Sequence, residues 1–128
     1  MAMRWVHAAA AVIFVAVIVI QVFLAGAALK ALGGSDDFAD HVAFGYSVVG
    51  LAALAVVVTA ALARVGRRRI GISALLFVLY IVQTSLPHAK SSIPAIAALH
   101  PVNALVLFAL ATWFAWTAWR DRNGPVAV

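Results

Sequence analysis

Residues 5–29 read WVHAAAAVIFVAVIVIQVFLAGAAL, a stretch that contains no Asp, Glu, Lys or Arg. A helix of about 20 apolar residues crosses roughly 30 Å of hydrocarbon, so this stretch is long enough to span a membrane. Three similar stretches follow at 41–63, 70–89 and 91–119. With the ends of the last two trimmed at their prolines, the sequence predicts membrane spans at about 5–29, 41–63, 70–87 and 96–119.

The composition also favours a membrane protein. Of the 128 residues, 66% are hydrophobic and 10% are charged. One domain of this size cannot bury so much apolar surface in water, so we expect lipid to cover part of residues 1–128. The chain has no cysteine, which excludes disulfides, thiolate metal sites and cysteine-anchored cofactors.

Basic residues are distributed unevenly about the four predicted spans. In this topology all of the arginines lie on one side of the membrane. The two lysines, Lys30 and Lys90, lie on the other side with Asp36, Asp37 and Asp40. The arginines are Arg4, Arg64, Arg67, Arg68, Arg69, Arg120 and Arg122. An excess of basic residues marks the cytoplasmic side, so we expect both termini to be cytoplasmic. The net charge of +5 is therefore attributed to membrane topology, and nucleic acid is not an expected partner.

The first apolar stretch has an alternative interpretation. Arg4 before it and the small residues 25–27 within it also occur in cleavable signal peptides. The stretch is longer than the apolar core of a signal peptide, which has about 7–15 residues. We therefore expect it to be retained as a membrane span.

The chain contains an internal repeat. VIQVFL at 19–24 corresponds to IVQTSL at 81–86, and each segment precedes an outer loop and a span that begins with histidine. The predicted fold is all-α: an integral membrane four-helix bundle, up-down-up-down, built from two pseudo-symmetric hairpins.

His41 and His100 are the histidines that begin the second and fourth spans. These spans run in the same direction and lie diagonally across such a bundle. The helical rise of about 1.5 Å per residue places both imidazoles at a similar depth near the outer face. Ionisable residues in membrane spans are functional candidates, and two facing imidazoles suit a haem iron with two axial nitrogens. We therefore predict one haem per chain, with His41 and His100 as metal ligands.

Residues near the two histidines are predicted to contact the cofactor. These residues are Gln21, Phe44, Gly45, Gln83, Asn103 and Ala104. Gly45 would allow close approach of a flat macrocycle, and the glutamines would donate to a propionate or to a histidine ring. Alternatively, each of these six residues only packs or hydrogen-bonds between membrane helices and contacts no cofactor.

The other histidines offer alternatives. His88 is either a replacement axial ligand or, with Lys90, a contact for the propionates. His7 begins the first span without an inner partner in the same chain, so we expect an interfacial residue there. A zinc site is a further alternative, built from Asp40, His41, His88 and His100.

The order of these features resembles one half of the bacterial haem A synthase family. There, each of two four-helix bundles carries histidines at the outer ends of its second and fourth helices. The likeness rests on residues 21–26, on His41, on QTSLP at 83–87 and on LHPVNAL at 99–105. It implies that His41 and His100 are the axial pair of haem b in a bacterial plasma membrane. The chain is more similar still to small uncharacterised bacterial four-span proteins whose last helix begins with a His-Pro-Val-Asn-like segment.

The chain also departs from that family. It has four predicted spans and not eight, Val42 stands where the family has an arginine after the histidine, and loop cysteines are absent. The resemblance therefore implies a haem-holding scaffold without implying oxidation of a haem methyl group.

Two classes of function remain open. The first is a membrane b-type cytochrome that acts in electron transfer or as a redox accessory subunit. The second is a non-haem membrane assembly factor or small-molecule carrier with structural histidines. A haem-modifying enzyme is the weaker third alternative, because no acid/base pair is visible. Besides the lipid bilayer and haem, a quinone, a redox protein or a second copy of the chain remain candidate partners.

Overall fold

The computed structural model describes residues 1–123, and the last five residues of the predicted domain, 124–128, lie outside that description. Its α-helices are α1 (Ala2–Ala28), α2 (Ala39–Phe44), α3 (Gly50–Leu62), α4 (Arg67–Ser85), α5 (Pro94–Ala97) and α6 (Leu99–Arg120). Short 3-10 turns occupy η1 (Lys30–Leu32) and η3 (Leu86–Ser91), and η2 (Gly45–Val49) is a π turn. Four continuous helical stretches are long and apolar enough to cross a membrane: Ala2–Ala28, Ala39–Leu62, Arg67–Ser91 and Pro94–Arg120.

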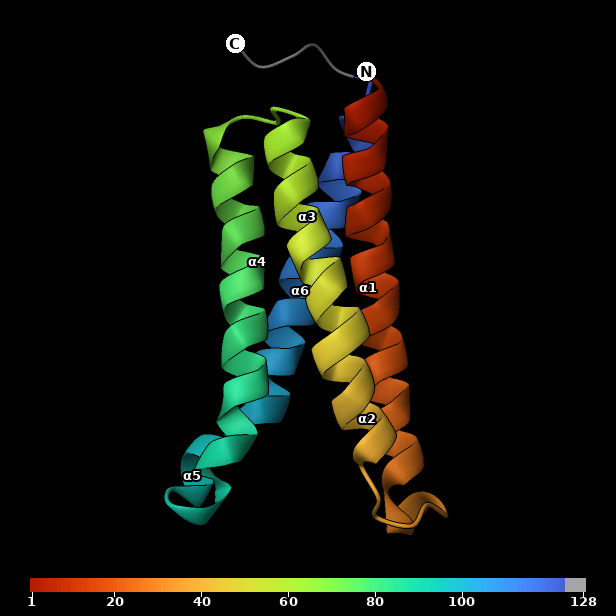
Figure 1. The fold of residues 1–128 in the computed structure, drawn as a ribbon, viewed down its shortest axis with the longest axis vertical. Helices are drawn as coiled ribbons and strands as arrows, with labels where there is room; N and C mark the ends of the chain where they lie inside the picture. Colours follow the sequence, from red (N-terminus) through yellow and green to blue (C-terminus); the bar gives the residue numbers. More distant parts are fainter. Residues whose placement is uncertain (124–128) are drawn as a thin grey trace.

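The long helices form a bundle (Figure 1). Both α1 and α4 contact α3 and α6. The spans that contain α3 and α6 therefore lie diagonally across the bundle, which is the up-down-up-down arrangement. The predicted all-α fold is confirmed, and it is consistent with an integral membrane four-helix bundle.

The core of the bundle combines many alanines with a few large apolar side chains. Ala8, Ala53 and Leu76 are fully buried, and Phe14 and Phe114 are the largest of the fully buried side chains. Small residues let membrane helices approach closely. Many large apolar side chains instead face outward, among them Phe23 and Leu105, each 70% exposed. Together with the four candidate spans, this exposure suggests a multi-pass membrane protein with lipid around it.

The two ends of the bundle differ. We call the end with the N-terminus, the connection between α3 and α4, and the end of α6 the arginine end; the opposite end, with His41 and His100, is the histidine end. The helices lie close together at the arginine end, whereas α1 and α2 diverge from α4, α5 and α6 at the histidine end (Figure 1). Here α2 packs on α1, while α5 packs on η3 and α6. The histidine end therefore consists of two hairpins that diverge from each other.

The π turn η2 joins α2 and α3 within the second span. Tyr80 of α4 donates its hydroxyl to the carbonyl oxygens of Gly45 and Tyr46, at 3.3 and 3.4 Å. Gly50 makes room for this contact, because a Cβ atom at Gly50 would lie 2.5 Å from the Tyr80 hydroxyl oxygen. A π turn shifts the register of the helix by one residue and is frequent near functional sites. The sequence pattern did not indicate it.

Proline shapes the connection between the third and fourth spans. Pro87 lacks the N–H that would continue the hydrogen bonding of α4, and α4 ends at Ser85. The 3-10 turn η3 and the short α5 follow before α6 begins at Leu99. Pro101 lies in the first turn of α6, where a backbone N–H has no partner within the helix.

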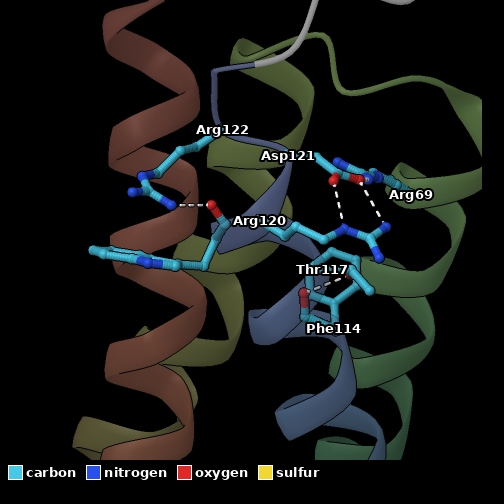
Figure 2. A network of polar contacts seen from close by, with 7 residues as sticks. Arg69, Phe114, Thr117, Arg120, Asp121 and Arg122 are labelled. Atoms are coloured by element: carbon cyan, nitrogen blue, oxygen red, sulfur yellow. Dashed lines mark hydrogen bonds and ion pairs between the residues drawn. The ribbon is translucent and has the colours of Figure 1, made fainter.

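One carboxylate connects α4 and α6 at the arginine end. Asp121 accepts hydrogen bonds from Arg120 and Arg69, and the distance from Arg120 Nε to Asp121 Oδ1 is 2.8 Å (Figure 2). The hydrogen bond from Arg120, reinforced by Arg69, lowers the pKa of Asp121 below its ordinary value. This ion-pair group closes the bundle at the end opposite His41 and His100.

Candidate functional site

His41 and His100 lie close together where the two hairpins diverge. His41 lies in the first turn of α2 and His100 in the first turn of α6. Their ring centroids are 6.3 Å apart and their planes are inclined at 71°. Both side chains are partly buried. The structure therefore brings together the two histidines that the sequence singled out.

The separation of the two rings is suited to a shared metal ion. A metal–imidazole bond is about 2.0–2.1 Å long and the ring centre lies about 1.1 Å beyond the nitrogen, so rings on opposite sides of one ion have centres roughly 6.2–6.4 Å apart. The observed 6.3 Å lies within that range. The spacing of the ring centroids is therefore compatible with one ion between the histidines.

Gln21 orients the imidazole of His41. The Nδ1–H of His41 donates to the backbone carbonyl oxygen of Gln21 at 3.1 Å. The side-chain amide of Gln21 donates to the backbone oxygen of His41 at 2.9 Å, and its nitrogen lies 3.1 Å from Nδ1 and 3.2 Å from Nε2 of the His41 ring. Because a carbonyl oxygen only accepts, Nδ1 carries the proton and Nε2 has the free lone pair.

Gln83 orients His100 in the same way. The Nδ1–H of His100 donates to the backbone oxygen of Gln83 at 2.9 Å, and the Gln83 amide nitrogen lies 3.1 Å from His100 Nε2. Pro87, four residues after Gln83, has no N–H to offer this carbonyl, so the oxygen is free to accept from the histidine. The glutamine–histidine repeat seen in the sequence is thus a repeated hydrogen-bond arrangement in the structure.

The two arrangements differ in what holds the glutamine. Asn103 donates to the side-chain oxygen of Gln83 at 2.7 Å and to the Leu79 carbonyl at 3.0 Å. The side-chain oxygen of Gln21 is buried, and it has no hydrogen-bond partner among residues 1–123. The side-chain amide of Gln83 therefore has partners at both its oxygen and its nitrogen, whereas the amide of Gln21 has partners at its nitrogen alone among residues 1–123.

The other predicted contacts have different surroundings. A Cβ atom at Gly45 would lie 2.8 Å from the Gln21 amide nitrogen, so the space at Gly45 is used by Gln21. This differs from the expected approach of a macrocycle at that position. Phe44 is partly buried and packs against the core, and Ala104 is partly buried on α6.

His88 and Lys90 lie apart from the pair, on the exposed turn η3. The His88 Nδ1–H donates to the carbonyl of Thr84, one turn earlier, at 3.1 Å. In the part of the chain that the structure describes, no three His, Cys, Asp or Glu side chains are grouped so that they could hold a metal ion. The alternative zinc site of Asp40, His41, His88 and His100 is therefore not assembled.

A polar pocket of about 260 Å³ opens beside His41. Leu24 and Ala28 of α1 line one side, and Asp37 and Asp40 line the other. The Asp37 carboxylate accepts a hydrogen bond from the Ala39 backbone N–H at 2.9 Å. This flank of the histidine pair is therefore negatively charged and does not suit an anionic group.

His7 lies near the start of α1 and is only 2% exposed, so it faces the inside of the bundle. Its depth at the membrane interface stays a prediction. Its Nδ1 is 3.1 Å from the Thr59 hydroxyl oxygen, and its ring packs edge-to-face on Phe114. Its Nε2 is buried without a hydrogen-bond partner among the described residues. Every face of α1 is apolar, so hydropathy did not indicate which face is buried.

Comparison with known proteins identifies a family. No curated protein and no solved structure matches the chain. A family model matches residues 21–89, which begin at Gln21 and end just beyond His88. That range covers more than half of the 128 residues. The chain therefore belongs to DUF6220, a family of unknown function.

Proposed function

We propose that this protein is a membrane b-type cytochrome that binds one haem b between its two hairpins. The observation that carries the proposal is the separation of 6.3 Å between the rings of His41 and His100. The resemblance of the Gln-to-His pattern to one half of the haem A synthase family supports the same ligand pair.

His41 and His100 would hold the iron through Nε2. In each ring Nδ1 donates to a backbone carbonyl, which is how proteins commonly orient metal-binding histidines. Both glutamine amides would rotate away from Nε2 to admit the iron. Haem supplies a one-electron centre, and two histidine ligands leave no open coordination position. The proposed role is therefore electron transfer, or support of a redox complex, and not an enzyme activity.

Charge suggests how the cofactor and the chain are oriented. Asp37 and Asp40 beside His41 disfavour propionates on that flank, whereas Lys90 and His88 follow α4 on the other hairpin. By the positive-inside rule, the arginine end faces the cytoplasm of a bacterial cell and the haem lies near the outer face of the plasma membrane. A quinone or a redox protein on that side is the candidate electron partner.

The absorption spectrum of the protein purified in detergent tests the proposal. We expect a Soret band and, after dithionite reduction, sharp α and β bands. His41→Ala and His100→Ala should each abolish this spectrum, whereas His88→Ala, the matched control on η3, should retain it. A protein that stays colourless when haem is supplied would refute the proposal.

A second candidate is a non-haem assembly factor or small-molecule carrier with structural histidines. The observation that favours it is that each Nε2 already has a glutamine amide beside it, at 3.2 Å for His41 and 3.1 Å for His100. The His100 ring then has hydrogen-bond partners at both nitrogens, whereas the Gln21 amide nitrogen lies almost equally far from the two ring nitrogens of His41, 3.1 Å from Nδ1 and 3.2 Å from Nε2. This alternative predicts that His41→Ala lowers the thermal unfolding midpoint of a colourless protein.

A further inference from the structure

An apolar groove of about 510 Å³ lies between α1 and α6. Its walls include Val12, Val15 and Ala16 of α1 and Thr112, Trp116 and Trp119 of α6. The Thr112 hydroxyl donates to the Phe108 carbonyl of its own helix at 2.8 Å, so it offers the groove no free donor. From residue 112 to residue 119 the groove extends about 10 Å along α6. Its length and apolar walls are suited to a hydrocarbon chain.

A positive charge lies over each tryptophan at the arginine end of this groove. The Arg120 guanidinium carbon is 4.9 Å from the ring centroid of Trp116. The Arg122 guanidinium carbon is 4.3 Å from the centroids of both Trp119 and Trp5. Stacking on indole rings fixes a guanidinium in place. The apolar groove therefore ends at two positioned cations.

The two arginines differ in their acidic partners. Arg120 and Arg69 share the Asp121 carboxylate, on the side of the network toward α4, whereas Arg122 extends toward α1 (Figure 2). No Asp or Glu of residues 1–123 forms an ion pair with Arg122. Arg122 donates to the Trp119 carbonyl. Its Nε is buried and has no acceptor within the described chain.

A buried guanidinium N–H without an acceptor destabilises the fold unless a ligand supplies one. A phosphate oxygen accepts such a hydrogen bond strongly, because both partners are charged. We propose that the groove binds one anionic phospholipid from the leaflet at the arginine end. Its phosphate accepts from Arg122, and one acyl chain lies between α1 and α6. A zwitterionic lipid carries its own ammonium group, and Arg122 has no acidic partner among residues 1–123, so its charge favours an anionic headgroup.

Native mass spectrometry of the detergent-solubilised protein tests this site. The protein is incubated with phosphatidylglycerol or with phosphatidylcholine of the same acyl chains. We expect one phosphatidylglycerol to be retained per chain, with an apparent affinity about tenfold above that of phosphatidylcholine, since the choline ammonium of phosphatidylcholine offsets the charge of the phosphate that Arg122 contacts. Equal retention of the two lipids would overturn the proposal.

Two variants separate the headgroup contact from the acyl-chain contact. Arg122→Gln should remove the preference for phosphatidylglycerol, and Ala16→Leu should weaken retention of the lipid by filling the groove. Arg68→Gln, at the same end but on α4, is the matched control and should bind as the wild type does. Retention of phosphatidylglycerol unchanged in Arg122→Gln or in Ala16→Leu would refute the assigned site.

Free glycerol phosphate distinguishes a lipid from a soluble phosphate. At the concentration at which phosphatidylglycerol binds, we expect glycerol phosphate neither to bind nor to displace the lipid. It has no acyl chain that could occupy the groove. Displacement at equal concentration would show a phosphate site and would overturn the lipid assignment. Circular dichroism checks that the variants fold, and the comparison of two lipids on the wild type remains decisive if a variant does not.

Discussion

His7 and Thr59 show how a single polar contact is placed in an apolar core. The Thr59 hydroxyl donates to the Ala55 carbonyl at 2.6 Å, which leaves its oxygen to accept from His7 Nδ1. This contact joins α1 to α3 beside Phe114 of α6, on which the His7 ring packs. A buried donor that loses its acceptor destabilises a fold more than the bond itself contributes.

We therefore expect Thr59→Val to destabilise the protein by about 0.5–2 kcal/mol, the range for interhelical hydrogen bonds in membranes. Thr112→Val is the matched control, because Thr112 is exposed and bonds only within α6. Thermal unfolding in detergent measures both variants. A loss of stability in Thr59→Val no larger than in Thr112→Val would contradict the assigned contact.

At the scale of elements, the second span depends on close contact with α4. The π turn between α2 and α3 exposes carbonyl oxygens that the Tyr80 hydroxyl contacts. Gly50 permits that contact because it has no side chain. The π turn sets the helical register of the second span. The direction of His41, one to two turns before it, therefore depends on Tyr80 and Gly50.

Gly50→Ala tests this dependence. A Cβ atom there would lie 2.5 Å from the Tyr80 hydroxyl oxygen, so the helices must separate, at a cost of about 1–3 kcal/mol. Gly71→Ala on α4, where a Cβ atom meets nothing within 4 Å, should be neutral or stabilising by up to about 1 kcal/mol. Adding Tyr80→Phe to Gly50→Ala should recover part of the lost stability. Equal unfolding midpoints for the two glycine variants would exclude the close contact.

The sequence indicated the elements better than the contacts between them. Hydropathy located four spans, and the repeat of Gln21 and Gln83 ahead of two histidines indicated which polar side chains meet. It could not indicate that His7 is buried, because α1 is apolar on all sides and burial has no periodic signal there. The π turn was also hidden, since it depends on Tyr80 of another helix.

At the scale of the whole molecule, the bundle is closed at one end and divided at the other (Figure 1). Asp121 connects α6 to Arg69 at the start of α4, while the two hairpins diverge at the histidine end. A rigid arginine end would keep the hairpins in register while the histidine end accommodates a ligand. The ion-pair group around Asp121 is therefore expected to contribute to the stability of the whole bundle.

The pH dependence of unfolding tests this role. Because the pKa of Asp121 is lowered in the folded protein, its ionised form stabilises the fold above its ordinary pKa of 3.8, and this contribution is lost as the pH falls through the lower folded value. Asp121→Asn should thus lower the thermal midpoint at neutral pH, and its difference from wild type should shrink below about pH 4. Asp40→Asn is the control at the other end. A difference that does not change with pH would contradict this assignment.

The proposed haem site requires both His41 and His100 of one chain, with one haem between the hairpins. Electron paramagnetic resonance of the oxidised, haem-loaded protein tests it most directly, because the spin state of the iron reports both axial ligands. We predict a low-spin ferric signal in the wild type and in His88→Ala, and its loss or conversion to high spin in His41→Ala and in His100→Ala. A high-spin wild type, or a low-spin signal that survives in either ligand variant, would contradict the account.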